Sequence, residues 1–289
     1  MMKKIFIIVL LILLCSCRKQ EKAVSYDIDA INRPDDCSEE FSFDLHSYGY
    51  MIVDLSDFDI IYSRNEGKRI YPASLTKVLT MDTVLHLADD LDDTSYVTYE
   101  QVEDLIYEDA SLAYIQRDYP YSLRDLLYAL VLPSGADAAL ALENYFSERG
   151  IDLVEQMNIL AQSLGCTDSH FVNSTGLHDD DHYTTIDDLY LIVMDTLKDE
   201  EGRKILTTIN HTMEDGLMIS TGIRYVRNDS TDVLGGKTGY TPEAGQNLIV
   251  LYRYESRPYL LMTAGAMGSN PRKQYWHFED ALKIFELVY

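Results

Sequence analysis

A serine and a lysine three residues apart, Ser74 and Lys77, are the residues of this sequence best suited to covalent chemistry. They lie where a loop leads into an apolar segment with helical spacing, and helix residues at i and i+3 share a face. A serine hydroxyl becomes a good nucleophile only when a base removes its proton. A lysine can be that base if burial or a second cation lowers the pKa of its ammonium group.

Two further segments contain the partners that such a nucleophile needs. Ser134 stands in a tight turn between two predicted helices, where its hydroxyl could point into a cleft or cap the second helix. Lys237, Thr238 and Gly239 follow one another on a predicted strand, where glycine permits the close approach of a ligand or another backbone. Lys237 could bind a substrate carboxylate and lower the pKa of Lys77; the alternative is an ordinary strand edge.

Together these segments resemble the Ser-x-x-Lys, Ser-x-Asn and Lys-Thr-Gly signature of penicillin-binding proteins and serine β-lactamases. Their flanking residues resemble more closely the D-alanyl-D-alanine carboxypeptidases, the low-molecular-weight penicillin-binding proteins. The resemblance runs from about Tyr48 to the C-terminus. It rests on Tyr-Pro-Ala-Ser-Leu-Thr-Lys at 71–77, Leu-Pro-Ser-Gly-Ala-Asp-Ala-Ala at 132–139, Phe-Val-Asn at 171–173, Gly-Leu-His-Asp at 176–179 and Gly-Lys-Thr-Gly-Tyr-Thr at 236–241.

The resemblance implies a serine-type D-Ala-D-Ala carboxypeptidase that removes the terminal D-alanine from peptidoglycan pentapeptide stems through an acyl-enzyme. Ser74 would attack the peptide carbonyl, Lys77 would take the proton, and Ser134 would help to relay it to the leaving D-alanine. β-Lactam antibiotics, which imitate D-Ala-D-Ala, would acylate the same serine as inhibitors. The resemblance implies no cofactor and no metal.

The same resemblance implies a substrate-binding role for the Lys-Thr-Gly-Tyr segment. Lys237 and Thr238 would hold the terminal carboxylate, and Gly239 would let the strand approach the substrate. The backbone N–H groups of Ser74 and Tyr240 would form the oxyanion hole, commonly the largest single contribution to this type of catalysis.

One position departs from the family pattern, because Ala136 stands where asparagine is usual. Alanine cannot hydrogen-bond the lysine base or the substrate amide, and a missing polar contact of this kind costs on the order of 1–3 kcal/mol. We therefore expect slow rather than absent catalysis. Asp137 or Asn173 could supply the missing contact, or the position could tolerate alanine.

Two other functions fit the same residues. A class A-like β-lactamase would share the fold, but it needs a glutamate-bearing loop to activate water, and the corresponding region holds residues 173–183 without a Glu-x-x-Leu-Asn stretch. A surface lipoprotein that binds penicillin or peptidoglycan, with catalysis weakened by Ala136, is the other alternative. His178 and His182 flank three aspartates, but no third spaced ligand follows, so we do not expect a metal site there and expect His178 to pack or cap.

Residues 1–17 are organised like a lipoprotein signal peptide. Two lysines precede an apolar run at 5–14, which is too short for a stable membrane span. Leu-Cys-Ser-Cys follows at 14–17 and indicates lipidation of Cys17; the alternative is an ordinary signal peptide cut nearby. Attached lipid chains would hold the protein on the outer face of the membrane.

The charge balance excludes several partners. With 48 acidic and 24 basic residues the formal net charge is −24, which argues against nucleic acid as a partner and against attachment to a membrane through a polybasic patch.

Two cysteines, Cys37 and Cys166, lie outside the signal peptide and could pair in an oxidising compartment. Their positions in a linker and after a helix favour two separate thiols instead.

The predicted elements indicate an α/β (α+β) fold, and the resemblance implies that it is of the β-lactamase and penicillin-binding transpeptidase type. Residues 18–40 form an acidic tether and residues 41–289 one D,D-peptidase domain. Strands at both ends suggest one antiparallel sheet, with a helical insert on one face and the last helix on the other. The predicted strands cover residues 48–55, 59–63, 232–237, 247–254 and 259–264, and the helices begin near 74, 122, 137, 151, 185 and 272.

Overall fold

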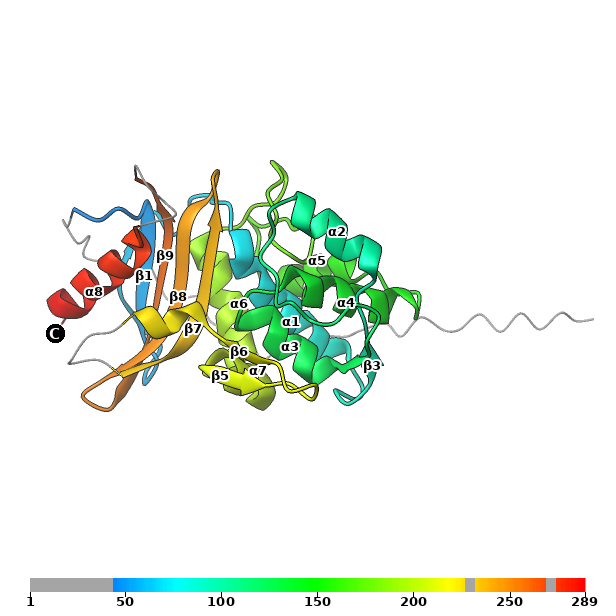
Figure 1. The fold of residues 1–289 in the computed structure, drawn as a ribbon. Helices are drawn as coiled ribbons and strands as arrows, with labels where there is room; N and C mark the ends of the chain where they lie inside the picture. The colour runs from blue at the N-terminus through cyan, green and yellow to red at the C-terminus, as the bar shows by residue number, and fades with distance from the viewer. Residues whose placement is uncertain (1–43, 227–231, 269–273, 289) are drawn as a thin grey trace, which may run out of the picture.

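A five-stranded antiparallel sheet divides the protein into two unequal layers of helices (Figure 1). The computed structural model describes residues 44–226, 232–268 and 274–288. The strand order is β2-β1-β9-β8-β7, as expected for an antiparallel sheet built from both ends of the chain. The strands are β1 (Gly49–Asp54), β2 (Asp59–Arg64), β7 (Asp232–Thr241), β8 (Gly245–Tyr254) and β9 (Arg257–Ala266).

A strand from the N-terminal part of the described chain meets one from its C-terminal part where β1 pairs with β9, for example with Met51 opposite Met262. Helix α8 (Trp276–Val288) packs against β8 and β9 on one face, and the other α-helices lie on the opposite face (Figure 1). Because both faces are covered, the central strands are almost continuously apolar instead of alternating. This confirms the predicted arrangement of sheet, helical insert and last helix.

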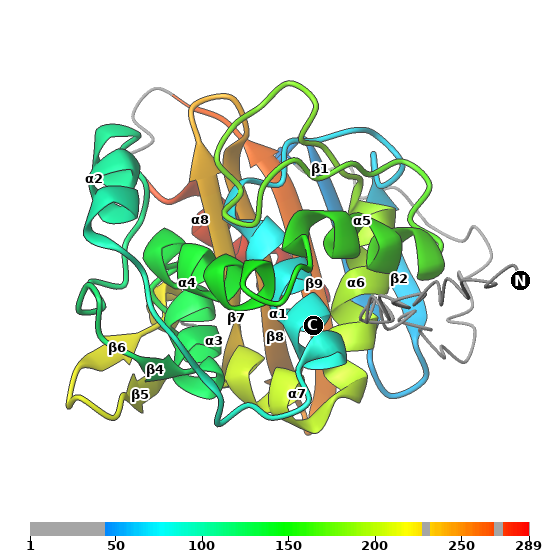
Figure 2. The same ribbon diagram turned by 90° about the vertical axis from the view of Figure 1, so that its right-hand side faces the viewer.

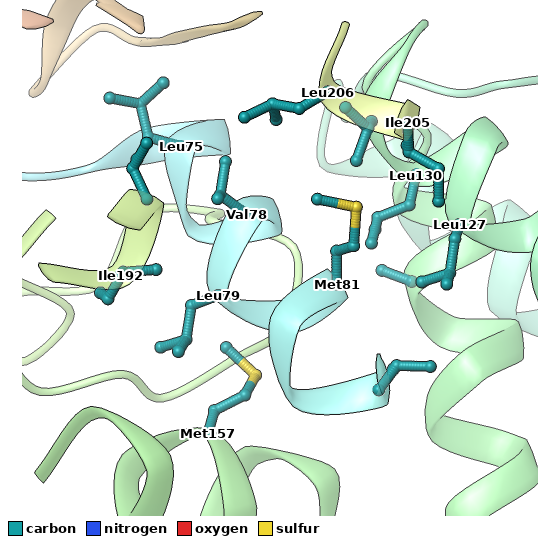
Figure 3. Packing of buried hydrophobic residues seen from close by; sticks show 14 of the residues in the cluster. Leu75, Val78, Leu79, Met81, Leu127, Leu130, Met157, Ile192, Ile205 and Leu206 are labelled. Carbon is teal, nitrogen blue, oxygen red and sulfur yellow. The ribbon is translucent and has the colours of Figure 1, made fainter. Parts of the chain in front are cut away.

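Helix α1 (Thr76–Leu87) is the centre of the helical layer (Figure 2). Every residue from Thr76 to Val84 is buried, which is typical of a helix enclosed on all sides. Apolar side chains of four surrounding helices pack against it (Figure 3). These helices are α3 (Leu123–Val131), α5 (Leu153–Ser163), α6 (Ile186–Lys198) and α7 (Glu200–Leu206).

Local signals explain where several helices begin. The Ser122 side chain caps α3 by accepting a hydrogen bond from the Asp125 N–H. The Asp125 carboxylate does not complete a capping box, because it bonds His211 and the Glu214 N–H instead. Helix α4 follows at Ala136–Ser147. A complete capping box begins α2 (Tyr99–Tyr107), which the sequence analysis did not predict.

The remaining elements are short and complete the connections. They are the 3₁₀ turns η1 (Ala73–Leu75) and η2 (Gly222–Tyr225), the pair β3 (Thr94–Ser95) and β4 (Tyr121–Ser122), and the pair β5 (Asn210–Thr212) and β6 (Met218–Ser220).

Within the described residues, no helix has the length and apolar character needed to cross a membrane.

The N-terminal predictions lie outside the part of the chain that the structure describes. This holds for the signal peptide, the tether, Cys17 and Cys37. Cys166 is buried, with its Sγ 3.5 Å from the carbonyl oxygen of Asp188. The expectation of two separate thiols therefore stays a prediction.

Candidate active site

Ser74 lies in the turn η1, immediately before α1 and beside strand β7. A Cβ atom added at Gly239 would lie 2.9 Å from the Pro72 carbonyl oxygen and 3.2 Å from the Ser74 nitrogen. Only glycine therefore lets β7 pass this close to the serine. The predicted helix start near Ser74 is a 3₁₀ turn, and the α-helix itself begins two residues later.

Lys77 lies one turn further along and reaches back to the serine. Its Nζ donates to the Ser74 Oγ at 3.1 Å and to the Thr175 carbonyl oxygen at 2.5 Å. The side chain is buried, and this desolvation lowers the pKa of Lys77 to about 7, against the opposing negative charge of Asp137. A lysine in this state loses its proton near neutral pH, as a general base must.

Ser134 and Lys237 form a second hydroxyl–amine pair. The Lys237 Nζ donates to the Ser134 Oγ at 2.8 Å and to the Thr238 carbonyl oxygen at 2.7 Å. Burial, together with the charge of Lys77, lowers the pKa of Lys237 well below its ordinary value.

Ser134 has an unusual backbone conformation. Its φ of 68° lies in the left-handed region, which residues other than glycine rarely adopt. The N-cap of α4 is Gly135 and its start has no side-chain cap, so the alternative that Ser134 caps this helix is wrong. Strain of this kind is often found at functional sites, where the surroundings enforce it.

A polar turn at residues 173–177 positions the carbonyl group that Lys77 contacts. The Asn173 Oδ1 accepts hydrogen bonds from the Thr175 and Gly176 N–H groups, and its Nδ2 donates to the Leu177 carbonyl oxygen. Gly176 has a φ of +77°, and a Cβ there would lie 2.0 Å from the Ala73 carbonyl oxygen. The turn therefore packs directly against the segment that carries Ser74.

Neither residue considered as a substitute for the missing asparagine fills that role. The Asp137 carboxylate accepts from the N–H groups of Ala113 and Ile115 and so holds the loop before α3. Asn173 is engaged within its own turn. The Thr175 carbonyl oxygen instead supplies a polar contact to Lys77.

The two histidines of the 178–182 segment have structural contacts. His182 is buried; its Nδ1 accepts from the Val172 N–H at 3.1 Å, so its Nε2 donates to the Thr76 Oγ1 at 2.8 Å. Burial lowers the pKa of His182 to about 4, which keeps the ring neutral. His178 packs edge-on against Tyr71. The contact of His178 agrees with the packing that was expected for it, and both ring nitrogens of His182 are occupied.

A cavity of about 720 Å³ brings the predicted residues together. Ser74, Lys77, Ser134 and Thr238 line it. Gly239, Tyr240 and Ala136 also contribute to its wall, whereas Lys237 reaches it through its contacts with Ser134 and Thr238.

The sequence analysis missed a cation in this wall, Arg224 of η2. Its guanidinium donates to the Ser220 Oγ and, at 2.9 Å, to the Tyr225 hydroxyl. No motif marks Arg224. The sequence offered only a general argument for it: a basic residue in the cleft of so acidic a protein is a candidate for binding an anion.

The chain matches known proteins in sequence. A family model described as D-alanyl-D-alanine carboxypeptidase matches residues 36–266. The Haemophilus influenzae D-alanyl-D-alanine carboxypeptidase DacA is 30% identical over 69% of this chain and 52% of its own length. The Bacillus subtilis carboxypeptidase DacF is 25% identical over 67% of this chain and 51% of its own length. The chain thus spans about half the length of these curated relatives.

Solved structures show the same fold. The Streptomyces K15 DD-transpeptidase superposes with a TM-score of 0.72 at 23% identity, covering 84% of this chain and 96% of that one. This confirms the expected penicillin-binding type of fold.

Proposed function

Because this chain belongs to the D-alanyl-D-alanine carboxypeptidase family, we propose that it is a serine D,D-carboxypeptidase. Its substrates are peptidoglycan pentapeptide stems, from which it releases the terminal D-alanine. The observation that carries this proposal is the contact of the buried Lys77 Nζ, 3.1 Å from the Ser74 Oγ, in the same cavity as Ser134.

Acylation begins when Ser74 attacks the carbonyl carbon of the last peptide bond. Lys77 takes the hydroxyl proton as the Oγ–C bond forms, and its lowered pKa suits this step. The C–N bond then breaks, and the proton passes through Ser134 to the nitrogen of the departing D-alanine. Water hydrolyses the resulting ester and restores the Ser74 hydroxyl.

The residues of the cavity wall support a proposal for how the substrate is held. Lys237 and the Thr238 hydroxyl hold the terminal carboxylate, and the positive charge of Arg224 in the cavity wall attracts it. The N–H groups of Ser74 and Tyr240 stabilise the oxyanion; the close passage of β7 at Gly239 supports this assignment.

The test is to incubate the purified chain with a pentapeptide ending in D-Ala-D-Ala and, separately, with benzylpenicillin. We expect release of free D-alanine, and a penicilloyl adduct that peptide mapping locates at Ser74. Ser74→Ala removes both, whereas Ser163→Ala, on the exposed surface of α5, is the matched control. An adduct or D-alanine release that survives Ser74→Ala contradicts the proposal.

The same experiment separates the other candidate functions. Rapid turnover of nitrocefin by the chain would support a class A-like β-lactamase. A stable adduct without D-alanine release would support a penicillin- or peptidoglycan-binding surface lipoprotein.

For its location we propose a lipoprotein on the outer face of the membrane. Residues 1–17 act as the signal peptide, Cys17 carries the lipid, and residues 18–40 form an acidic tether to the catalytic domain at 41–289. Cys17→Ala should move the protein from the membrane fraction of the producing cells to the soluble fraction. Unchanged membrane association contradicts a lipid at this residue.

A further inference from the structure

A cluster of potential metal ligands lies within the helical layer, at residues that do not line the active-site cavity. Asp82 and His86 come from α1 and Asp195 comes from α6. One ligand atom from each of the three lies within 4.8 Å of the other two. Asp82 and His86 are four residues apart, so they share a face of α1, and that face packs against α6.

The cluster is buried on its carboxylate side and open on its histidine side. Asp82 is 1% exposed and Asp195 is 6% exposed, whereas His86 reaches the surface. The Asp82 Oδ2 is buried without a hydrogen-bond partner among the described residues. An oxygen in that position has lost its hydration and received no donor in exchange, which is unfavourable.

The contacts already present do not supply this missing partner. The His86 Nε2 lies 2.8 Å from Asp195, and the Lys198 Nζ lies 3.5 Å from the other oxygen of Asp195. The nearby Thr196 Oγ1 donates to the Ile192 carbonyl oxygen at 3.0 Å, so it does not satisfy the Asp82 Oδ2. Two carboxylates are therefore held together in a buried position, and a cation between them would satisfy both.

We propose that Asp82, His86 and Asp195 bind one zinc-like divalent cation. Imidazole nitrogen and carboxylate oxygen are both ligands that Zn²⁺ accepts, and water would complete the tetrahedron from the exposed side at His86. Ca²⁺ and Mg²⁺ fit less well, because they require six or more oxygen ligands. The Lys198 Nζ, 3.5 Å from an oxygen of Asp195, would orient that carboxylate, as an outer partner of a metal ligand does.

The bound ion would tie α1 to α6. Since α1 begins two residues after Ser74, the ion would stabilise the helix that carries Lys77 without contacting the substrate. Ligand linkage at 100 times the dissociation constant predicts a rise in Tm of roughly 5 °C or more.

The test uses the full chain freed of metal with a chelator and then titrated with ZnCl₂. Native mass spectrometry should show one zinc per chain, and the Tm should rise. Co²⁺ in place of Zn²⁺ should show the visible absorption bands of a tetrahedral site. Cys15, Cys17 and Cys37 are replaced by serine as a background change, because thiols outside the described residues could also bind zinc.

Three substitutions decide the outcome. Asp82→Asn and His86→Ala should each remove the zinc-dependent rise in Tm and the Co²⁺ bands. Asp104→Asn, an exposed carboxylate of α2, is the control and should leave both unchanged. His86 is exposed, so its substitution by alanine decides the question even if Asp82→Asn fails to fold.

The proposal is overturned if the unaltered chain shows neither bound zinc nor a Tm shift at 100-fold excess. It is also overturned if His86→Ala binds zinc as well as the unaltered chain does, or if Mg²⁺ gives the same Tm shift. These readouts do not depend on D-alanine release, so they are independent of the proposed activity.

Discussion

Lys77, the proposed general base, must be neutral before it can accept the proton of Ser74. Burial lowers its pKa to about 7, so its neutral fraction rises as the pH passes upward through 7. The rate of acylation by benzylpenicillin should therefore increase between pH 6 and pH 8 and level off above. Quenched time courses followed by intact mass would measure this profile.

A substitution separates the effect of the Lys77 protonation state from a general loss of substrate binding. Lys77→Arg keeps a permanent positive charge, so it should lose a factor of roughly 10² to 10⁴ in acylation rate at every pH. A pH profile that stays flat between 6 and 8 in the unaltered chain would contradict Lys77 as the base.

Ala136 is the second residue whose chemistry can be tested in isolation. It lines the cavity, and the usual asparagine would add an acceptor for Lys77 and a contact for the substrate amide. Ala136→Asn should therefore raise the acylation rate roughly tenfold, about 1.4 kcal/mol of transition-state stabilisation. An unchanged or lower rate would mean that the Thr175 contact already replaces the asparagine.

At the scale of elements, the site depends on how closely strand β7 passes the turn η1. A Cβ at position 239 would press on the Pro72 carbonyl oxygen and on the nitrogen of Ser74. Gly239→Ala should displace the strand, misplace the oxyanion donors and slow acylation roughly a hundredfold. Stopped-flow nitrocefin or mass-based acylation would measure the loss.

Gly67→Ala is the matched control, since a Cβ there meets only Asp187 Oδ2 at an ordinary 3.5 Å. This control should acylate at the unaltered rate. If Gly239→Ala acylates equally fast, the close approach of β7 has no catalytic role.

For the whole molecule, two buried histidines predict sensitivity to acid. Burial lowers the pKa values of His182 and His277 to about 4, whereas both return to about 6.5 on unfolding. Between these values the unfolded chain binds more protons, so the free energy of unfolding falls as the pH drops from 6.5 to 4. Each histidine contributes at most about 3 kcal/mol to this loss.

His277 offers the cleaner measurement, because its Nδ1 pairs with the Gln246 side chain at 2.7 Å. In His277→Gln the decrease in Tm between pH 7 and pH 5 should be smaller than in the unaltered chain. His170→Gln, at an exposed histidine, is the control. Equal decreases in all three proteins would contradict the prediction.

Much of the fold could be predicted because it depends on local patterns. The apolar runs of β8 and β9, the cap at Ser122 and the periodicity of α3 are all readable from neighbouring residues. Helix α2 was missed although Thr98 and Gln101 form a capping box. Exposed acidic residues alternate with its apolar ones, so the apolar face is hard to recognise in the sequence.

By itself the sequence determined the family, the sheet with its two helical layers and the three motifs, because these follow from residue type, spacing and hydrophobic pattern. Only the tertiary structure decided that Thr175 offers its carbonyl to Lys77, that Lys237 bonds Ser134, and that Arg224 enters the cavity wall. These contacts join segments far apart in the chain. They depend on the packing of whole elements around α1, which no local pattern specifies.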